Sequence, residues 1–420
     1  MDDFPALLRA LPLEVFETPK SDDAWARCPL AAASDAVLVH AVAAAISPPK
    51  VQIGSSFLLH APLELLARTW LLSRVGGSRR DQARRRIAEI GARYATEGRE
   101  IESELKEYSD SQTALSELEE ALRAGDAEAL DRAVLFLAPR IPFERFRATL
   151  ADRILPLLGA AGHASILLMM LNDPAVRFPG SNKLLRSPLR ALALEANRRL
   201  TWMEAPEQAE QRCVPALFDA LAAPEPRAAS STSIAPTMLA VEHGGYAARL
   251  LGAATTDMSA LTARRILLRV AALSMLLDDP VHAPYGWTHC FTLPQAILSL
   301  ADVASDVTRT IRLAATYVLG FRATLGRVPL KYSYVSKPRV PGISHHQAPA
   351  DGAAAVFKAG TGQHESIKTR LIERAAAHAD AHLAKYTMAC LVAADQDPRE
   401  TSLYLAAAAY LGGWWDSQSP

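Results

Sequence analysis

Apolar side chains recur at helical spacing along most of the chain, a pattern typical of amphipathic α-helices. Leu383, Met388 and Leu391 follow this spacing near the C-terminus, with Ala384 and Ala389 between them. Alternating Val- and Ile-rich runs, which would indicate half-buried strands, are scarce. We therefore predict an all-α protein, formed by a single large multi-helix domain with a central buried pocket.

The same pattern sets the expected boundaries of the elements. Residues 1–50 are expected to form an irregular, partly helical segment with a helix at 35–46. The Pro-rich residues 330–361 are expected to form a long loop, of the kind that often acts as a lid. No internal repeat or composition break divides the chain, so we expect one domain over residues 1–420. Further helices are expected over residues 55–70, 126–158, 186–221, 240–251, 261–277, 303–320, 366–394 and 401–414.

His382 and Lys385 are three residues apart in the predicted C-terminal helix, so their side chains share one face. An ionised lysine is rarely buried without a partner, so this pair on an apolar face needs an explanation. The ordinary explanation is a lysine that extends to water and a histidine that caps a carbonyl. A functional pair is the alternative.

Charge and composition exclude several classes of protein. Lys+Arg and Asp+Glu are equal at 45 each among the 420 residues, so the charge balance does not indicate nucleic-acid binding, and we expect no nucleic-acid partner. The arginine run that starts at Arg79, followed by acidic residues up to Glu120, is typical of a solvated helix face with ion pairs, and an anion-binding arm is the minority alternative. The four cysteines are far apart, which argues against a zinc ribbon and favours a reducing compartment. Without a signal peptide or a membrane-spanning run, we expect a cytoplasmic protein with no membrane partner.

The candidate chemistry lies in the histidines. The chain has no glycine-rich dinucleotide or phosphate motif and no GxSxG motif, which argues against a built-in flavin or NADPH domain. His60, His163, His289 and His382 occur in apolar, helix-compatible surroundings, and neutral imidazoles are good ligands for iron, zinc or copper. Each of them alone is more often a structural residue than a ligand.

Four segments resemble the questin-oxidase-like family. Leu59-His-Ala-Pro is similar to the Asn-His-Gly-Pro helix of that family, and the segment that ends in Gly162-His163 is similar to its Leu-Pro…Gly-Ala…His segment. Thr288-His-Cys-Phe-Thr292 resembles its His-Ala-Val-Thr segment, and Asp380-Ala-His-Leu-Ala-Lys385 resembles its His-x-x-Lys helix. The matches occur in the same order from about residue 55 to the C-terminus. Leu59, Cys290-Phe291 and Met388 depart from the pattern, which implies a changed substrate pocket.

The resemblance implies an all-helical non-haem iron oxygenase of secondary metabolism. It would act with O2 on a polycyclic aromatic or polyketide-like small molecule, by Baeyer-Villiger-like oxygen insertion or by oxidative C–C cleavage. The Fe(II) ligands carried over from the family are His60, His163, His289, His382 and Lys385, with Lys385 carboxylated by CO2. His382 and Lys385 would be the catalytic pair. Another divalent metal is an alternative, and the need for NADPH or another reductant stays open.

Three further residues could contact a substrate: His243, Tyr246 and Trp287. Tyr246 and Trp287 could stack on an aromatic ring, although ordinary packing is the default for both. Two other functions remain open, namely a metal-dependent hydrolase or isomerase on the same fold, and a non-enzymatic helical scaffold whose histidines are structural. The oligomeric state is also open, with a homodimer as one option.

Overall fold

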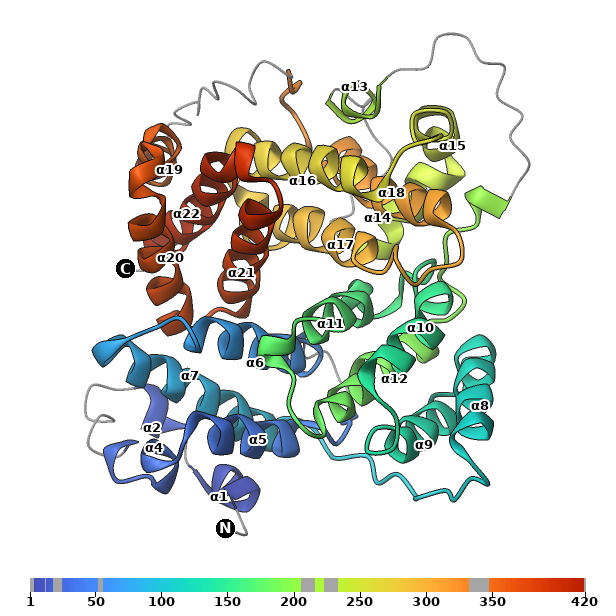
Figure 1. Ribbon diagram of the computed structural model, residues 1–420, viewed down its shortest axis with the longest axis vertical. Coiled ribbons are helices and arrows are strands. Elements are labelled where there is room, and N and C mark those ends of the chain that lie inside the picture. Colours follow the sequence, from blue (N-terminus) through green and yellow to red (C-terminus); the bar gives the residue numbers. More distant parts are fainter. Residues whose placement is uncertain are drawn as a thin grey trace. The chain divides into compact units, whose positions relative to one another are not determined.

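The predicted all-α class is confirmed by the computed structural model (Figure 1). The structure describes residues 4–11, 13–17, 25–51, 56–204, 216–222, 233–331 and 347–418. These residues contain α-helices, short 3-10 turns and one π-helical turn, and they contain no strand beyond two isolated β-bridges. No helix in the described part of the chain has the length and apolar character needed to cross a bilayer.

By its internal contacts the chain divides into two compact units, each drawn from three segments. Unit 1 comprises residues 1–153, 166–197 and 372–385, and unit 2 comprises residues 154–165, 198–371 and 386–420. The expectation of one domain over residues 1–420 with a central pocket stays a prediction.

Unit 1 is built around the buried helices α5 (Asp35–Ile46) and α6 (Ser56–Leu72). Helix α5 has the boundaries expected from the sequence, because the Ser34 hydroxyl caps its first turn and a Pro-Pro pair follows Ser47. Helix α6 stays helical across Pro62. The other helices of unit 1 are α1 (Phe4–Ala10), α2 (Glu14–Glu17), α4 (Pro29–Ala32), α7 (Gly77–Thr96), α8 (Ser111–Ala124), α9 (Ala127–Leu137), α10 (Phe143–Ile154) and α12 (Arg186–Leu194). Helix α11 (His163–Leu171) contributes to both units, since its first turn, with His163, belongs to unit 2.

The arginine run lies on α7 and bonds to the protein itself. Arg80 and Arg84 both pair with Asp35, and Arg84 also donates to the Leu30 carbonyl at 2.9 Å. Arg85 donates to the Val15 carbonyl at 2.8 Å. These contacts support the prediction of a helix face laced with ion pairs, and they tie the N-terminal helices to α7.

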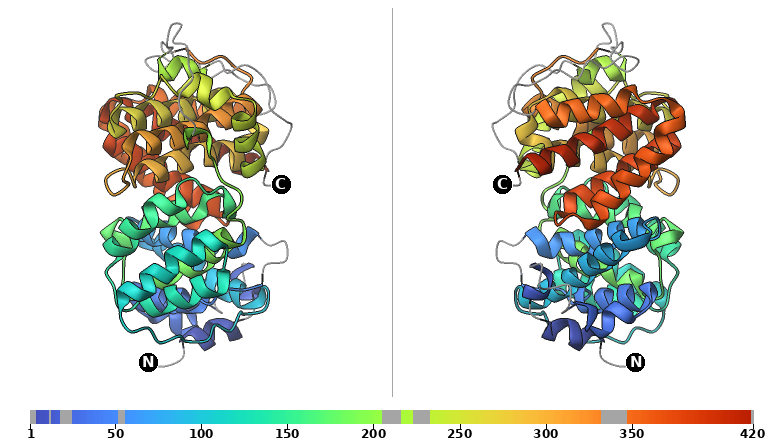
Figure 2. Two further views of the ribbon diagram at one scale, coloured as in Figure 1. Left: turned by 90° about the vertical axis from the view of Figure 1, so that its right-hand side faces the viewer. Right: turned by 90° about the vertical axis from the view of Figure 1, so that its left-hand side faces the viewer.

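Unit 2 contains α16 (Ala260–Leu277), α17 (Thr288–Leu298) and α18 (Val307–Leu325), which contact one another, and α19 (Gln347–Lys358), which packs on α22 (Thr401–Gln418). The orange and red helices α19 and α22 lie side by side in Figures 1 and 2. A Cβ at Gly413 would come within 2.9 Å of Pro349, so the glycine allows this close approach. Unit 2 also contains α13 (Leu217–Ala222), α14 (Ile234–His243) and α15 (Tyr246–Leu251), and α20 (His364–Ala377) and α21 (Ala381–Gln396) contribute to both units.

The structure corrects three expected elements. The helix expected over residues 240–251 is split, because Gly245 has φ +69° and ends α14. The helix expected over residues 366–394 is two helices, α20 and α21, separated at residues 378–380. The long loop expected over residues 330–361 contains α19, since its alanine-rich middle favours a helix and Pro349 sits in the first turn, where proline is tolerated. Residues 332–346 of that loop lie outside the described part.

Candidate functional site

His60 lies in the second turn of α6, and its ring is held by the backbone of the turn before it. Its Nδ1 is 2.7 Å from the carbonyl oxygen of Ser56. Because a carbonyl only accepts, Nδ1 carries the proton and the ring presents its lone pair at Nε2. Metal-binding histidines are commonly oriented in this way. Within unit 1, the His60 ring centroid is 4.7 Å from that of His382.

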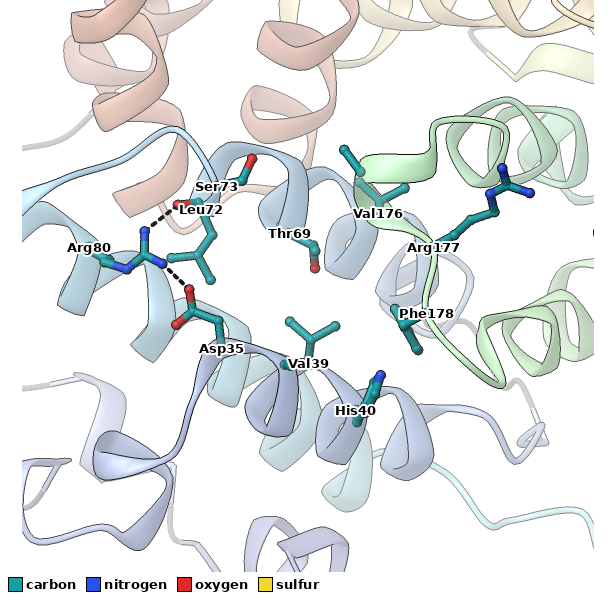
Figure 3. A pocket seen from close by; sticks show the side chains of 12 residues that line it. Asp35, Val39, His40, Thr69, Leu72, Ser73, Arg80, Val176, Arg177 and Phe178 are labelled. Atoms are coloured by element: carbon teal, nitrogen blue, oxygen red, sulfur yellow. Dashed lines mark hydrogen bonds and ion pairs between the residues drawn. The ribbon is translucent and has the colours of Figure 1, made fainter.

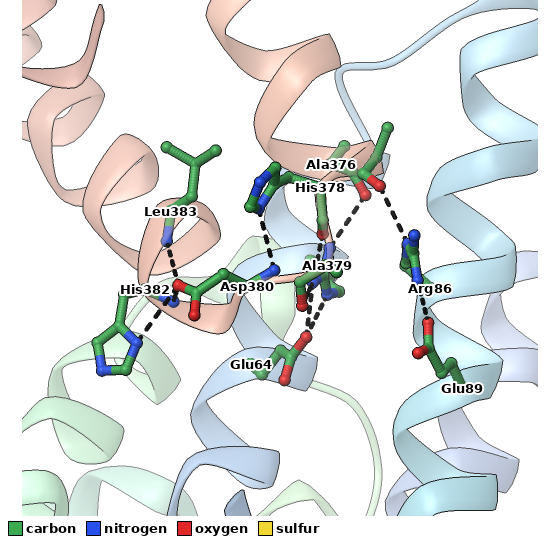
Figure 4. A network of polar contacts seen from close by, with 11 residues as sticks. Glu64, Arg86, Glu89, Ala376, His378, Ala379, Asp380, His382 and Leu383 are labelled. Carbon is green, nitrogen blue, oxygen red and sulfur yellow. Dashed lines mark hydrogen bonds and ion pairs between the residues drawn. The ribbon is translucent and has the colours of Figure 1, made fainter. Parts of the chain in front are cut away.

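His382 lies in the first turn of α21, two residues after Asp380, whose carboxylate caps this helix (Figure 4). The Asp380 carboxylate accepts from the amides of His382 at 2.7 Å and Leu383 at 3.3 Å, and it is 3.4 Å from His382 Nδ1. Burial would raise the pKa of Asp380, but the hydrogen bonds from the His382 ring and the two amides bring this pKa below its usual value. The pKa of His382 is lowered by burial and by the charge of Lys385, which together outweigh Asp380.

Lys385 follows His382 on the same face of α21, and only 4% of it is exposed. This burial rules out the ordinary explanation in which the ammonium group reaches water. Burial lowers the pKa of Lys385 to about 7, and the negative charges of Asp380 and Glu64 oppose the shift. The amine therefore exists largely in its neutral, nucleophilic form at slightly alkaline pH.

His163 and His289 form a second pair, within unit 2. Their ring centroids are 5.8 Å apart with the ring planes at 72°. His289 Nδ1 is 2.6 Å from the carbonyl oxygen of Tyr285, so this ring too presents its lone pair at Nε2. Tyr285 belongs to a π-helical turn, Ala283–Trp287, that leads into α17. Such turns are rare and often occur at functional sites.

The turn before His163 is the most unusual backbone of the described chain. Ala160, Ala161 and Gly162 have φ values of +49°, +50° and +71°, so three consecutive residues are left-handed. Each alanine in this conformation costs roughly 1–2 kcal/mol. Strain of this kind concentrates at functional sites, where the surrounding fold maintains it. A Cβ at Gly162 would overlap Cδ2 of Leu293 on α17, so the turn lies directly against the helix that carries His289.

The donor set fits a transition metal. His60, His163 and His289 are three buried histidines that could hold a metal ion. Imidazole suits iron, zinc, copper and nickel, so the donors do not select among these metals. Sequence analysis predicted His60, His163, His289, His382 and Lys385 as ligands. The structure pairs His60 with His382 in unit 1 and His163 with His289 in unit 2, and their role as ligands stays a prediction.

The predicted substrate contacts have different surroundings. His243 is exposed at the end of α14, and Tyr246 lies under Arg249, whose guanidinium carbon is 5.2 Å from the tyrosine ring centroid. Trp287 is fully buried and donates its indole N–H to the Asp279 carbonyl at 3.3 Å. These assignments stay predictions.

Sequence reasoning missed Glu64 and Arg68, a buried ion pair one and two turns after His60 on α6. Their signal was available, since a Glu and an Arg four residues apart interrupt an otherwise apolar helix. It also missed a pocket of about 410 Å³ in unit 1, between α5, α6, α7 and residues 175–178 (Figure 3). None of the predicted ligands lines this pocket, and its Arg80 and Asp35 pair with each other.

No family model matches the chain, and comparisons with the curated proteins and with the solved structures likewise found no match.

Proposed function

We propose that the chain is a metal-dependent enzyme, a non-haem iron oxygenase that acts on a polycyclic aromatic or polyketide-like small molecule. The observation that carries the proposal is the set of buried histidines, His60, His163 and His289, that could hold a metal ion. The oxygenase class rests on the resemblance of four segments to the questin-oxidase-like family.

The ligands in this proposal are the three histidines together with His382 and Lys385. Two features support the assignment. The Nδ1 atoms of His60 and His289 each bond to a backbone carbonyl four residues earlier, which directs Nε2 toward a ligand position. Unusual backbone precedes two of the rings, the left-handed turn before His163 and the π-helical turn before His289.

Fe(II) held by these residues would supply dioxygen activation and would orient a phenolate or enolate substrate. The chain's own part is to bind and orient. Burial excludes water from the rings, and the Asp380 carboxylate, 3.4 Å from Nδ1 of His382, favours the tautomer that carries its proton there. The buried amine of Lys385 would add CO2: a nitrogen–carbon bond forms, one proton is released to solvent, and an anionic carbamate oxygen results. That anion would offset the positive charge of a divalent ion.

The test starts with the metal content of the purified full-length chain, measured by inductively coupled plasma mass spectrometry after anaerobic loading with Fe(II). We expect about one iron per chain, as one mononuclear site requires. His289→Ala should lose most of the iron, whereas His364→Gln, which changes a histidine that bonds to Ser402, should keep it. Dioxygen uptake is then measured with a panel of hydroxyanthraquinones, with and without NADPH.

Each result decides between classes. Iron with substrate-dependent dioxygen uptake supports the oxygenase. If the purified protein retains zinc and takes up no dioxygen, the result favours a hydrolase or isomerase over the oxygenase. A chain that binds no metal, and in which His289→Ala changes nothing, contradicts the enzyme proposal and leaves a helical scaffold.

A further inference from the structure

The guanidinium group of Arg68 on α6 is buried and fully engaged within unit 1. Only 1% of Arg68 is exposed, and its Nε donates to Glu64 Oε1 at 2.7 Å. Its Nη1 donates to the Ala376 carbonyl at 3.1 Å, and its Nη2 donates to the His378 and Ala379 carbonyls at 2.8 and 3.2 Å. One side chain from α6 therefore binds three carbonyls that lie more than three hundred residues later in the chain.

The His378 and Ala379 carbonyls belong to the connection between α20, which ends at Ala377, and α21, which begins at Ala381, and the Ala376 carbonyl lies in the last turn of α20 (Figure 4). The connection is fixed at its amides as well. The Asp380 amide donates to His378 Nδ1 at 3.0 Å, and the Asp380 carboxylate accepts from the His382 amide and lies 3.4 Å from its ring. A continuous series of contacts thus runs from Arg68 through the connection to His382.

The pair is poorly explained as a source of stability. Removing two charges from water costs several kcal/mol per ion, so a buried ion pair is often no more stabilising than apolar residues of similar volume. What the pair does provide is geometry, because a planar guanidinium with several donors fixes the carbonyls it binds. Glu64 in turn holds Arg68, and it lies on α6 one turn after His60.

We propose that the Glu64–Arg68 pair is the positioning element of the metal centre, and that it holds His382 and Lys385 in register with His60. The inference rests on the proposed function. Neither Glu64 nor Arg68 is a metal ligand in this proposal. Arg68 acts on the centre through the 378–380 connection, and Glu64 acts through Arg68.

The chain offers a matched control in Arg86. Arg86 reaches the same helix end from α7, donating to the Ala377 carbonyl at 3.0 Å and pairing with Glu89. It bonds neither to residues 378–380 nor to Glu64 through any contact that the structure describes. Loss of Arg86 therefore loosens the end of α20 without releasing the connection to α21.

The experiment titrates the full-length protein with Co(II), whose visible absorption bands report the geometry of the bound ion. The variants are Arg68→Lys, the charge-free double variant Glu64→Gln with Arg68→Met, and Arg86→Met. We expect the wild type and Arg86→Met to bind with the same affinity and spectrum. We expect both Arg68 variants to bind about 10- to 100-fold more weakly with altered bands, as for residues that orient metal ligands, while their far-ultraviolet circular dichroism is unchanged.

The outcomes separate the two claims. Wild type that binds no Co(II) contradicts the proposed function itself. If the wild type binds Co(II) and the Arg68 variants match it in affinity and spectrum, the positioning role is wrong while the metal centre stands. If Arg86→Met weakens Co(II) binding as much as the Arg68 variants do, the positioning role is also wrong, because the weakening then comes from a general loosening of α20. If the double variant does not fold, Arg68→Lys decides, because the lysine keeps the charge opposite Glu64, but its three donors cannot serve Glu64 and all three carbonyls together.

Discussion

Replacing Gly162 by alanine perturbs the left-handed turn before His163 in two separable ways. The residue has φ +71°, a conformation that costs a non-glycine residue roughly 1–2 kcal/mol. The new methyl group would also overlap Leu293, and overpacking of this kind typically costs about 1–3 kcal/mol. We therefore expect Gly162→Ala to lower the free energy of unfolding by about 2–5 kcal/mol, a large part of the total stability of an ordinary domain.

A control in the same unit isolates the conformational cost. Gly245 has φ +69°, but a Cβ there would meet no atom within 4 Å. Gly245→Ala should therefore cost only about 1–2 kcal/mol. Urea unfolding followed by circular dichroism compares the two variants, and adding Leu293→Ala to each tests whether the extra cost at Gly162 comes from the overlap. Equal losses for the two glycine variants, or an extra loss that Leu293→Ala does not relieve, would refute the close contact between the turn and α17.

Three further outcomes are expected. Arg322→Met should lower the free energy of unfolding by about 3–5 kcal/mol in urea titrations, because it leaves the buried carboxylate of Asp278 without its partner; a loss below about 1 kcal/mol would contradict this. Lys385→Met should change the free energy of unfolding of the metal-free protein by less than about 1.5 kcal/mol, because the two side chains have similar volumes. The same variant should abolish any carbamate signal in 13C NMR with labelled bicarbonate, and a persisting signal would place the carbamate elsewhere. Burial raises the pKa of the Cys290 and Cys390 thiols, so peptide mapping after iodoacetamide treatment at pH 8 should find both unmodified in the native protein and alkylated only after unfolding.

The helices were largely predictable because their signals are local. Ser34 and the Pro-Pro pair after Ser47 bracket α5, and apolar spacing marked α16 to within one residue. The break between α20 and α21 was not predictable, since residues 378–380 carry no glycine or proline. The carbonyls at that break bond to Arg68, which lies 308 positions before the first of them.

For the site as well, features with a local sequence signal were predictable and features set by long-range packing were not. The burial of the four histidines and of Lys385 could be predicted from their apolar context, and it is confirmed. Their role as metal ligands, which the family resemblance implies, stays a prediction. The left-handed turn was not readable, because nothing in Ala160-Ala161 distinguishes it from helix. Such strain is imposed by packing against Leu293 and the rest of unit 2, which sequence periodicity does not encode.

The central claim, that the buried histidines hold one metal ion, is tested most directly by X-ray absorption at the metal edge of the purified, Fe(II)-loaded chain. The account predicts the multiple-scattering pattern of several imidazoles, with nitrogen and oxygen ligands at roughly 2.0–2.2 Å, and the loss of that pattern in His60→Ala and His289→Ala. An ion without imidazole scattering in the wild type, or a spectrum that stays unchanged from the wild type in both variants, would contradict it.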